Sequence, residues 1–420
     1  MVDKSANTEI RNNLPQLSLA ERDRRWKAVR EKMSENSLDC LLVWGNDIFW
    51  SSGMANFRYL TQIGSRHGGF LIFPLSGNPV VFNSPLHMNK PFNAFALAQE
   101  WVDDVRPNLG IKEVIETFKT EFPRAKRIGL VGKASQISSD IVTYRDYSIL
   151  VTELKGVSVI ESDALLDTVR MFKSKEEISF LDKSGDIALK AIEKLIDTTA
   201  VGVKENELLA SMLYTQIANG AEAEIFNFLH SEPIEGNDKL RHLLHGVEQP
   251  VSPTTRQLRE GDLVITEFHT SYGGYLTAAE FSVFVGRIPD PLKRISEICI
   301  ECLDSALEKF KPGNTVSEVV EAIRRPAKKA GLDFVELGFH GHGLSSPEFP
   351  TVVLKPGFGI LSGEGIEDFV LQENMVFGTN IDIFDPAWKS DVGLMFGDTV
   401  VVKDKPLLMV NTPRYLPEKN

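Results

Sequence analysis

Hydrophobic positions follow one pattern in the first 160 residues of the chain and a different one after about residue 170. In the first part, the short apolar runs 40–45 (CLLVWG) and 68–74 (GGFLIFP) are bounded by turn residues, which predicts buried strands. The stretch 19–35 has helical periodicity and an acidic start, which predicts an amphipathic helix. Because strands and helices alternate to about residue 160, we expect an α/β domain with a mixed or parallel sheet.

Longer helical patterns dominate the second part of the chain. Amphipathic helices are expected in four stretches, 176–198, 204–219, 291–310 and 316–330. Strands rich in Val, Ile and Phe separate them, and segment 263–286 predicts a hairpin around Gly273 and Gly274. This part is therefore expected to be an α+β domain. The predicted boundaries are residues 1–168 for the first domain and 169–420 for the second.

The net charge and the cysteines indicate which binding partners and which cellular compartment to expect. The chain has 420 residues and a formal net charge of −12, which disfavours nucleic acid because a phosphate backbone needs a basic face. The sequence has no apolar run long enough to span a membrane, and its N-terminal segment lacks a signal-peptide core. Cys299 and Cys302 fall in a helical pattern and are expected to pack in a core, since a zinc site needs a second ligand pair. We expect a cytoplasmic protein.

Several motifs carry a resemblance to a known family. The stretch that contains Arg170, Lys173, Ser174, Glu176, Glu177 and Ile178 matches an R-x-x-K-S-x-x-E-I junction. Segment 56–64 (NFRYLTQIG) matches a strand of the family's N-terminal domain, and 310–323 (FKPGNTVSEVVEAI) matches a helix before a histidine. On these motifs, nearly the whole chain resembles the creatinase/prolidase/methionine aminopeptidase family. The resemblance implies a creatinase-like α/β N-terminal domain followed by an α+β "pita-bread" catalytic domain.

The ligand positions of this family are altered in the chain. Metal-dependent members supply Asp, Asp, His, Glu and Glu in that order along the sequence. On that template this chain has Glu267, Ala278, His340, Asn380 and Gly397. Alanine and glycine have no side-chain donor, whereas a pair of hard divalent ions needs several carboxylate oxygens. The resemblance therefore favours the metal-free, creatinase-like branch, with no metal and no cofactor, while a rearranged single-metal site stays open as an alternative.

One carboxylate stands beside a lost ligand position. The stretch Thr277, Ala278, Ala279, Glu280 is similar to the T-A-x-E pattern of creatinase, in which the glutamate binds a guanidinium group. On a strand, Ala278 and Glu280 share one face, so Glu280 is expected beside the lost ligand. A carboxylate there needs a cationic group or a protonated partner. The alternative is a glutamate on a solvated strand face.

Two histidines are candidates for catalysis. His340 in FHGHGL is similar to the histidine of the family's G-H-G-I-G motif, whereas His342 is expected where the family has an apolar residue. His245 is followed by glycine and then by P-T-T-R, like a family histidine that contacts the substrate. His230 and His242 compete with His245 for that role, and the sequence does not decide between them.

Further residues are candidates for substrate binding. The second pocket glutamate of creatinase falls at Asn380, and Asp382 lies two positions on, where it can supply the missing negative charge. Glu267 replaces the first aspartate of the template. Arg66 resembles a creatinase arginine that reaches the partner subunit's site and pairs with the substrate carboxylate, and Arg58 is its competitor.

These residues lead to one hypothesis and two alternatives. The hypothesis is a homodimeric, metal-independent, creatinase-like hydrolase, with its site near the subunit interface, that cleaves a C–N bond in a small carboxylate-bearing amidino, guanidino or compatible-solute compound. In it His245 is the base, Glu280 orients the cationic group, and His340 donates to the oxyanion. The alternatives are a metal-dependent Xaa-Pro dipeptidase, aminopeptidase or lyase with a rearranged metal site, and a non-catalytic binding module. The sequence identifies neither the substrate nor the scissile bond.

Overall fold

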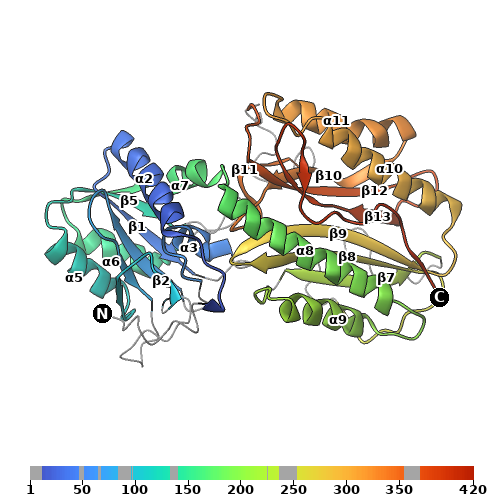
Figure 1. The fold of residues 1–420 in the computed structure, drawn as a ribbon, viewed down its shortest axis with the longest axis horizontal. Coiled ribbons are helices and arrows are strands. Elements are labelled where there is room, and N and C mark those ends of the chain that lie inside the picture. The colour runs from blue at the N-terminus through green and yellow to red at the C-terminus, as the bar shows by residue number, and fades with distance from the viewer. Residues whose placement is uncertain are drawn as a thin grey trace. The chain divides into compact units, whose positions relative to one another are not determined.

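The chain divides into two compact units in the computed structural model. Unit 1 comprises Met1–Glu176 and Leu344–Pro350, and unit 2 comprises Glu177–Gly343 and Thr351–Asn420. The structure describes residues 12–46, 52–64, 68–83, 96, 98–132, 141–224, 226–235, 253–353 and 369–420. Arg66, His242 and His245 lie outside the described residues, so the expectations about them stay predictions. Figure 1 shows both units and labels their larger elements.

Unit 1 is built on a mixed six-stranded sheet of order β4-β3-β2-β1-β5-β6. Its strands are β1 (Cys40–Gly45), β2 (Gly69–Pro74), β3 (Val80–Phe82), β4 (Asp104–Arg106), β5 (Arg127–Val131) and β6 (Ser158–Glu161). Its helices are α2 (Leu19–Glu35), η2 (Ser52–Met54), α3 (Ala55–Thr61), α5 (Ile111–Glu121), α6 (Tyr144–Glu153) and α7 (Asp163–Arg170). The central strand β1 runs antiparallel to β2 and parallel to β5. The expected α/β domain with a mixed sheet is confirmed.

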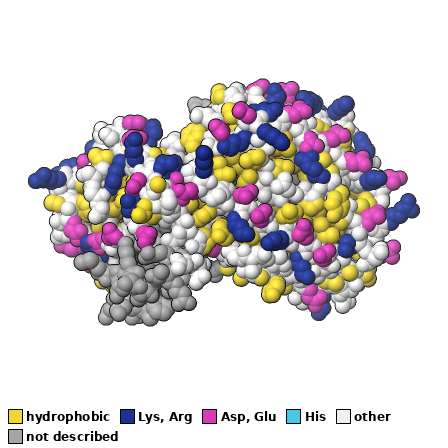
Figure 2. All heavy atoms as spheres, viewed as in Figure 1, with side chains coloured by type: hydrophobic (Ala, Val, Ile, Leu, Met, Phe, Trp, Pro, Cys, Tyr) yellow, Lys and Arg dark blue, Asp and Glu magenta, His cyan; other side chains and the backbone are white. Residues whose placement is uncertain are grey.

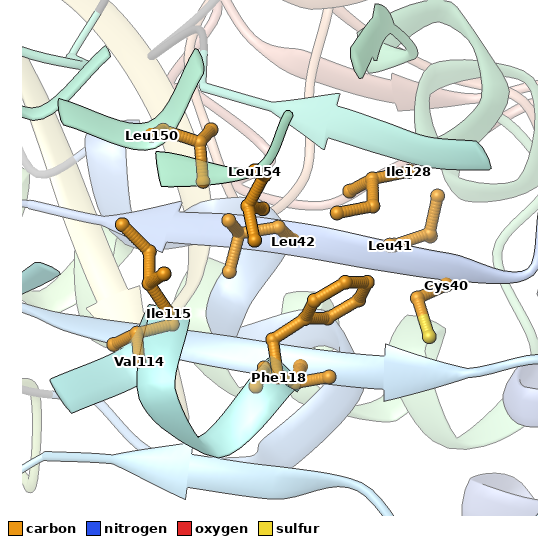
Figure 3. A pocket seen from close by; sticks show the side chains of 10 residues that line it. Cys40, Leu41, Leu42, Val114, Ile115, Phe118, Ile128, Leu150 and Leu154 are labelled. Atoms are coloured by element: carbon orange, nitrogen blue, oxygen red, sulfur yellow. The ribbon is translucent and has the colours of Figure 1, made fainter. Parts of the chain in front are cut away.

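The apolar core of unit 1 lies between the sheet and helices α5 and α6. Figure 3 shows side chains of these elements converging on a small pocket, with Leu42 of β1, Phe118 of α5 and Leu150 of α6 among them. Cys40 lines the same space, and burial together with the charge of Asp39 raises the pKa of its thiol to about 12. The thiol therefore stays neutral and packs as an apolar group.

Segment 56–64 differs from its prediction, because it forms a helix and not a strand. Helix α3 (Ala55–Thr61) ends at Gln62, which has a left-handed φ of 59°. Two donors from α2 bind the carbonyls at its last turn: Arg25 Nη1 donates to Tyr59 O at 3.0 Å, and Trp26 Nε1 donates to Leu60 O at 2.9 Å. Orphan carbonyls at a helix end need such partners. Because these donors lie on a different helix, the sequence of segment 56–64 alone does not indicate them.

A buried ion-pair network lies inside unit 1. The carboxylate of Glu348 contacts both Arg170 and Lys173, and Arg170 also donates to Asn56 Oδ1 at 2.7 Å and to Ser345 Oγ at 2.9 Å. Burial alone would raise the pKa of Glu348, but the charges of Lys173 and Arg170 hold it below its ordinary value. The network thus fixes segment 344–350 within unit 1.

Unit 2 contains the four long helices that the sequence predicted. They are α8 (Lys175–Thr198), α9 (Glu205–Ala218), α10 (Asp290–Leu307) and α11 (Val316–Ala330). In Figure 1, α10 and α11 lie on one side of the strands of this unit, and α8 and α9 lie on the other. Cys299 and Cys302 are buried on α10, so the prediction of core packing is confirmed.

Two sheets form the centre of unit 2. One has the order β16-β9-β8-β7, and the other has the order β11-β10-β12-β14-β15, with β13 paired to β12. The strands are β7 (Asn227–Pro233), β8 (Asp262–Tyr272), β9 (Tyr275–Val285), β10 (Asp333–Gly341), β11 (Glu348–Val353, of which residues 348–350 are assigned to unit 1), β12 (Val376–Phe384), β13 (Gly393–Phe396), β14 (Thr399–Val401), β15 (Leu407–Leu408) and β16 (Glu418–Lys419). The predicted hairpin is β8–β9, which turns through Gly273 and Gly274 at φ values of 59° and 84°. With both sheets and the helices, the expected α+β domain is confirmed.

The two sheets of unit 2 are joined through β9. Gly397 N donates to Glu280 O at 3.1 Å, and Ser282 Oγ donates to Met395 O at 3.2 Å. Thr399 Oγ1 accepts from the backbone N–H of Ala278 at 2.9 Å. Side chains on the facing sides of β9 and β12 are therefore brought within contact distance.

Candidate functional site

One face of the β8–β9 hairpin carries polar side chains in register. Glu267 lies directly opposite Glu280, and His269 lies opposite Ala278. Residues two apart on a strand share a face, so all four point to the same side of the sheet. His230 on β7 lies opposite Ile265 and is fully buried on that same face.

The second sheet presents a matching polar face. On β10 and β12, His340 lies opposite Gly378, and Glu336 lies opposite Asp382. The strand period places Asn380 on this face as well, because it stands between Gly378 and Asp382 at steps of two. Glu336 was not selected from the sequence, although it stands four positions before His340 and therefore shares its strand face.

Glu280, on the polar face of the first sheet, is hydrogen-bonded to residues of the second sheet. Asn380 Nδ2 donates to Glu280 Oε1 at 2.7 Å, and the backbone N–H of Ile381 donates to Glu280 Oε2 at 3.2 Å. The carboxyl of Asp382 is hydrogen-bonded to the Glu280 carboxyl. We call Glu267, Glu280, Glu336, Asn380 and Asp382 the acid–amide cluster.

The environment favours protonation of this carboxyl pair. Burial, reinforced by the nearby Glu336, raises the pKa of Glu280 to about 8. Burial also raises the pKa of Asp382 well above its ordinary value, with contributions from the charges of Glu280, Glu336 and Glu267. A hydrogen bond between two carboxyl groups requires a proton, so the Glu280–Asp382 pair holds at least one proton at neutral pH.

Three buried histidine rings lie beside one another: His269 on β8, His340 on β10, and His342 one residue after the end of β10. The ring centroid of His342 is 5.4 Å from those of both His269 and His340. His269 also stacks on Phe226, with centroids 4.1 Å apart. Burial and the neighbouring His340 lower the pKa of His269 to about 3, so this ring is neutral at physiological pH.

Gly378 makes room for two of these rings. A Cβ at this position would lie 2.7 Å from His342 Cδ2 and 3.1 Å from His340 Cε1. His340 Nδ1 is 3.0 Å from Gly341 O. Because a carbonyl oxygen only accepts, Nδ1 carries the proton in this contact.

The structure brings together most of the site residues predicted from the sequence. Glu280, Asn380 and Asp382 are in direct contact, and Glu267 and His340 stand on the same two facing strand surfaces. Glu280 is 2% exposed, which excludes the alternative of a solvated strand face. The partner expected for its carboxylate is present as Asp382 together with the Asn380 amide.

The residues present do not fit the five-ligand metal set of the family template. Ala278 and Gly397 supply no donor, and a Cβ at Gly397 would lie 2.3 Å from Thr379 O and 3.0 Å from Glu280 Oε2. Glu280 is engaged with Asn380 and Ile381. Within the part of the chain that the structure describes, no group of three or more His, Cys, Asp or Glu side chains is placed to hold a metal ion.

Comparison with known proteins identifies the family. Residues 179–404 match the model of metallopeptidase family M24, and residues 25–172 match the creatinase/prolidase N-terminal domain. The M24 match covers more than half of the chain, and the chain therefore belongs to metallopeptidase family M24, a family of hydrolases. The resemblance noted in the sequence is confirmed at this level, and the assignment to a metal-free branch is not.

The similar proteins are peptidases. An Xaa-Pro dipeptidase of Pyrococcus furiosus is 25% identical over 374 residues, covering 89% of this chain and 93% of the relative. A methionine aminopeptidase of Staphylococcus epidermidis is 29% identical over 252 residues, covering 56% of this chain and 96% of the relative. The crystal structure of the prolidase from Pyrococcus horikoshii OT3 superposes with a TM-score of 0.73 at 23% identity, covering 94% of this chain and 99% of that one, which shows a shared fold.

These findings correct the functional hypothesis. The expectation of a metal-independent, creatinase-like hydrolase is wrong, because the matching family is a metallopeptidase family and the similar proteins are Xaa-Pro dipeptidases. The two missing donors at Ala278 and Gly397 do not by themselves define a metal-free branch. The relatives also do not support a non-peptide C–N substrate, since their names are those of peptide hydrolases.

The other expectations about partners and setting are tested less directly. None of the described helices combines the length and apolar character needed to cross a membrane. On the face of the described surface seen in Figure 2, acidic and basic side chains are interspersed. The homodimer and the cytoplasmic location stay predictions.

Proposed function

We propose that this protein is a hydrolase that cleaves the peptide C–N bond of short substrates of the Xaa-Pro dipeptide class. The observation that carries the proposal is the buried polar cluster of Glu280, Asn380, Asp382 and His340, which stands at or beside the family's ligand positions. Xaa-Pro dipeptidases that align over about nine-tenths of the chain support the same substrate class.

The chemistry of such a substrate suits the residues present. A dipeptide carries an ammonium group at one end, a carboxylate at the other and a single amide carbonyl between them. In the proposed reaction His340, whose Nδ1 contacts Gly341 O, donates a hydrogen bond to the developing oxyanion at the carbonyl oxygen. The Glu280–Asp382 pair holds a proton beside the reacting amide. We further propose that Arg66 binds the substrate carboxylate and that His245 is the general base that takes a proton from the attacking water.

The experiment is an assay of free proline release from Ala-Pro and Leu-Pro, with Ala-Ala and creatine as comparison substrates. The assay is run without added metal and with Mn²⁺, Co²⁺ and Zn²⁺ separately, so that any metal dependence is measured. Proline release under at least one of these conditions, faster than cleavage of Ala-Ala, supports the proposal. Absence of proline release under every condition, from protein with a cooperative thermal transition, contradicts it.

A further inference from the structure

Asp398 is a buried carboxylate that the proposed reaction does not use. It lies directly before β14 and is 1% exposed. Its Oδ1 accepts from the backbone N–H groups of Thr399 at 2.7 Å and Val410 at 3.0 Å, and its Oδ2 accepts from Thr412 N–H at 2.8 Å. Burial raises the pKa of this carboxyl to about 6, so it is mostly ionised at neutral pH. Because hydrogen bonds to a charged group are stronger than neutral ones, the carboxylate fixes segment 409–412 beside β14.

The main chain of Asp398 is bound to Thr379 on β12. Thr379 donates to Asp398 O twice, from its backbone N–H at 2.9 Å and from Oγ1 at 3.0 Å, and Thr379 Oγ1 accepts from Asp398 N–H at 3.0 Å. Thr379 is the residue before Asn380, whose amide donates to Glu280 Oε1. A displacement of Asp398 would therefore move the backbone from which the Asn380 side chain extends.

Gly397, the residue before Asp398, contacts the backbone of Glu280. Its N–H donates to Glu280 O at 3.1 Å, and the two residues form an isolated β-bridge. Its carbonyl accepts from Thr412 Oγ1 at 2.8 Å. Segment 409–412 therefore binds two consecutive residues, one on the Glu280 side of the site and one on the β12 side.

Segment 409–412 is packed too tightly to absorb a displacement. Met409 is 5% exposed, and its N–H donates to Thr399 O at 2.8 Å. A Cβ at Gly185 of α8 would lie 1.9 Å from Met409 O, so the helix backbone and the segment are in direct contact. Close-packed interiors transmit strain, so a change at the Asp398 carboxylate is expected to reach the site.

We infer that Asp398 is a positioning residue that holds Glu280 and Asn380 at hydrogen-bonding distance. It acts through segment 409–412 and the main chain next to it, and it does not contact the substrate. This inference rests on the proposed function and adds a residue on which the geometry of the same site depends. Asp398→Asn replaces a carboxylate oxygen by an Nδ2 donor that would face a backbone N–H donor, so the segment must shift. Displacement of a reacting group by about 1 Å can cost about 100-fold in rate.

The test is infrared spectroscopy of the protonated Glu280–Asp382 carboxyl pair at pH 7, which reports hydrogen bonding without requiring turnover. The band of the pair is the carboxyl C=O band that Glu280→Gln changes and that Glu297→Gln, at an exposed carboxylate on α10, leaves in place. Asp398→Asn is expected to shift this band. Asp304→Asn is the matched control and is expected to keep the wild-type band, because it alters an exposed carboxylate outside segment 409–412.

The second readout is steady-state kinetics on Ala-Pro. Because Asp398 does not contact the substrate, Asp398→Asn is expected to lower kcat by about 10- to 100-fold and to leave KM close to the wild-type value. Asp304→Asn is expected to keep both values. A loss of folded protein alone would lower the active concentration without shifting the carboxyl band, so the two readouts together separate positioning from stability.

A wild-type band in folded Asp398→Asn protein would overturn the inference, and so would a wild-type kcat. Where that variant loses its cooperative thermal transition, Thr412→Val decides, because it removes only the hydroxyl that donates to Gly397 O. Thr412→Val is expected to shift the band, and an unchanged band would again overturn the inference. A shifted band in variants of a protein whose wild type releases no proline would uphold the inference and leave the proposed function contradicted.

Discussion

Asn380 and Glu280 hold each other in place across two sheets, through a 2.7 Å hydrogen bond from the amide Nδ2 to the carboxyl Oε1. The pair joins β12 to β9 at the point where the family template has ligand positions. Its carboxyl is protonated more readily than a solvated one, because it is buried beside further acids.

Replacement of Glu280 by glutamine is expected to change how stability depends on pH. The pKa of Glu280 is raised from 4.5 to about 8 in the folded protein, so the folded state binds more protons than the unfolded state between these values. The free energy of unfolding therefore falls as pH rises from about 4.5 to about 8, by up to about 1.4 kcal/mol per pH unit. Urea denaturation at pH 5, 6, 7 and 8 should show a shallower fall for Glu280→Gln than for the wild type or Glu297→Gln. An identical fall in all three would contradict the buried acid pair.

Restoring a glutamate at position 397 is expected to destabilise the protein. A Cβ there would lie 2.3 Å from Thr379 O, which is a backbone atom and cannot swing aside. Overpacking of this kind costs about 1–3 kcal/mol or more. The urea midpoint of Gly397→Glu should therefore fall, while that of Ala218→Glu, at an exposed site on α9, should stay near the wild type. A Gly397→Glu protein of wild-type stability would show that the β12–β14 region opens to accept a ligand side chain.

The buried network of unit 1 leads to a third prediction. Glu348→Gln leaves the cations of Arg170 and Lys173, which are 5% and 3% exposed, without a carboxylate partner. Removing one member of a buried ion pair costs about 3–5 kcal/mol. Urea denaturation should show this loss, whereas Glu153→Gln, which breaks the exposed pair with Lys119, should leave the midpoint unchanged. Equal midpoints for both variants would mean that the network does not stabilise unit 1.

Local sequence patterns were sufficient for the elements whose signals lie within a few residues. The Gly273–Gly274 turn set the β8–β9 hairpin, since both residues adopt positive φ at no steric cost. Segment 56–64 was assigned to a strand, because the donors from Arg25 and Trp26 that hold the end of its helix are remote in sequence. Predictions failed where tertiary partners decide the local structure.

The site could be predicted in part for a similar reason. The period of a strand placed Glu280 beside Ala278, and Asp382 beside Asn380, on faces that the structure brings together. No local signal indicates the pairing of β10 with β12, so Glu336 was not recognised as a neighbour of Asp382. The missing ligand residues at positions 278 and 397 indicated a change in chemistry but did not identify the reaction. The family match and the similar peptidases corrected the functional hypothesis.

The most direct test of the central claim is the kcat/KM for Ala-Pro hydrolysis of three proteins side by side: the wild type, Glu280→Gln and the control Glu297→Gln. We expect the wild type and Glu297→Gln to release proline at similar rates. Glu280→Gln is expected to lose on the order of 100-fold or more in kcat/KM, as for removal of a group that holds or transfers a proton. Equal kcat/KM for Glu280→Gln and the wild type would contradict the assignment of the acid–amide cluster as the site of peptide hydrolysis.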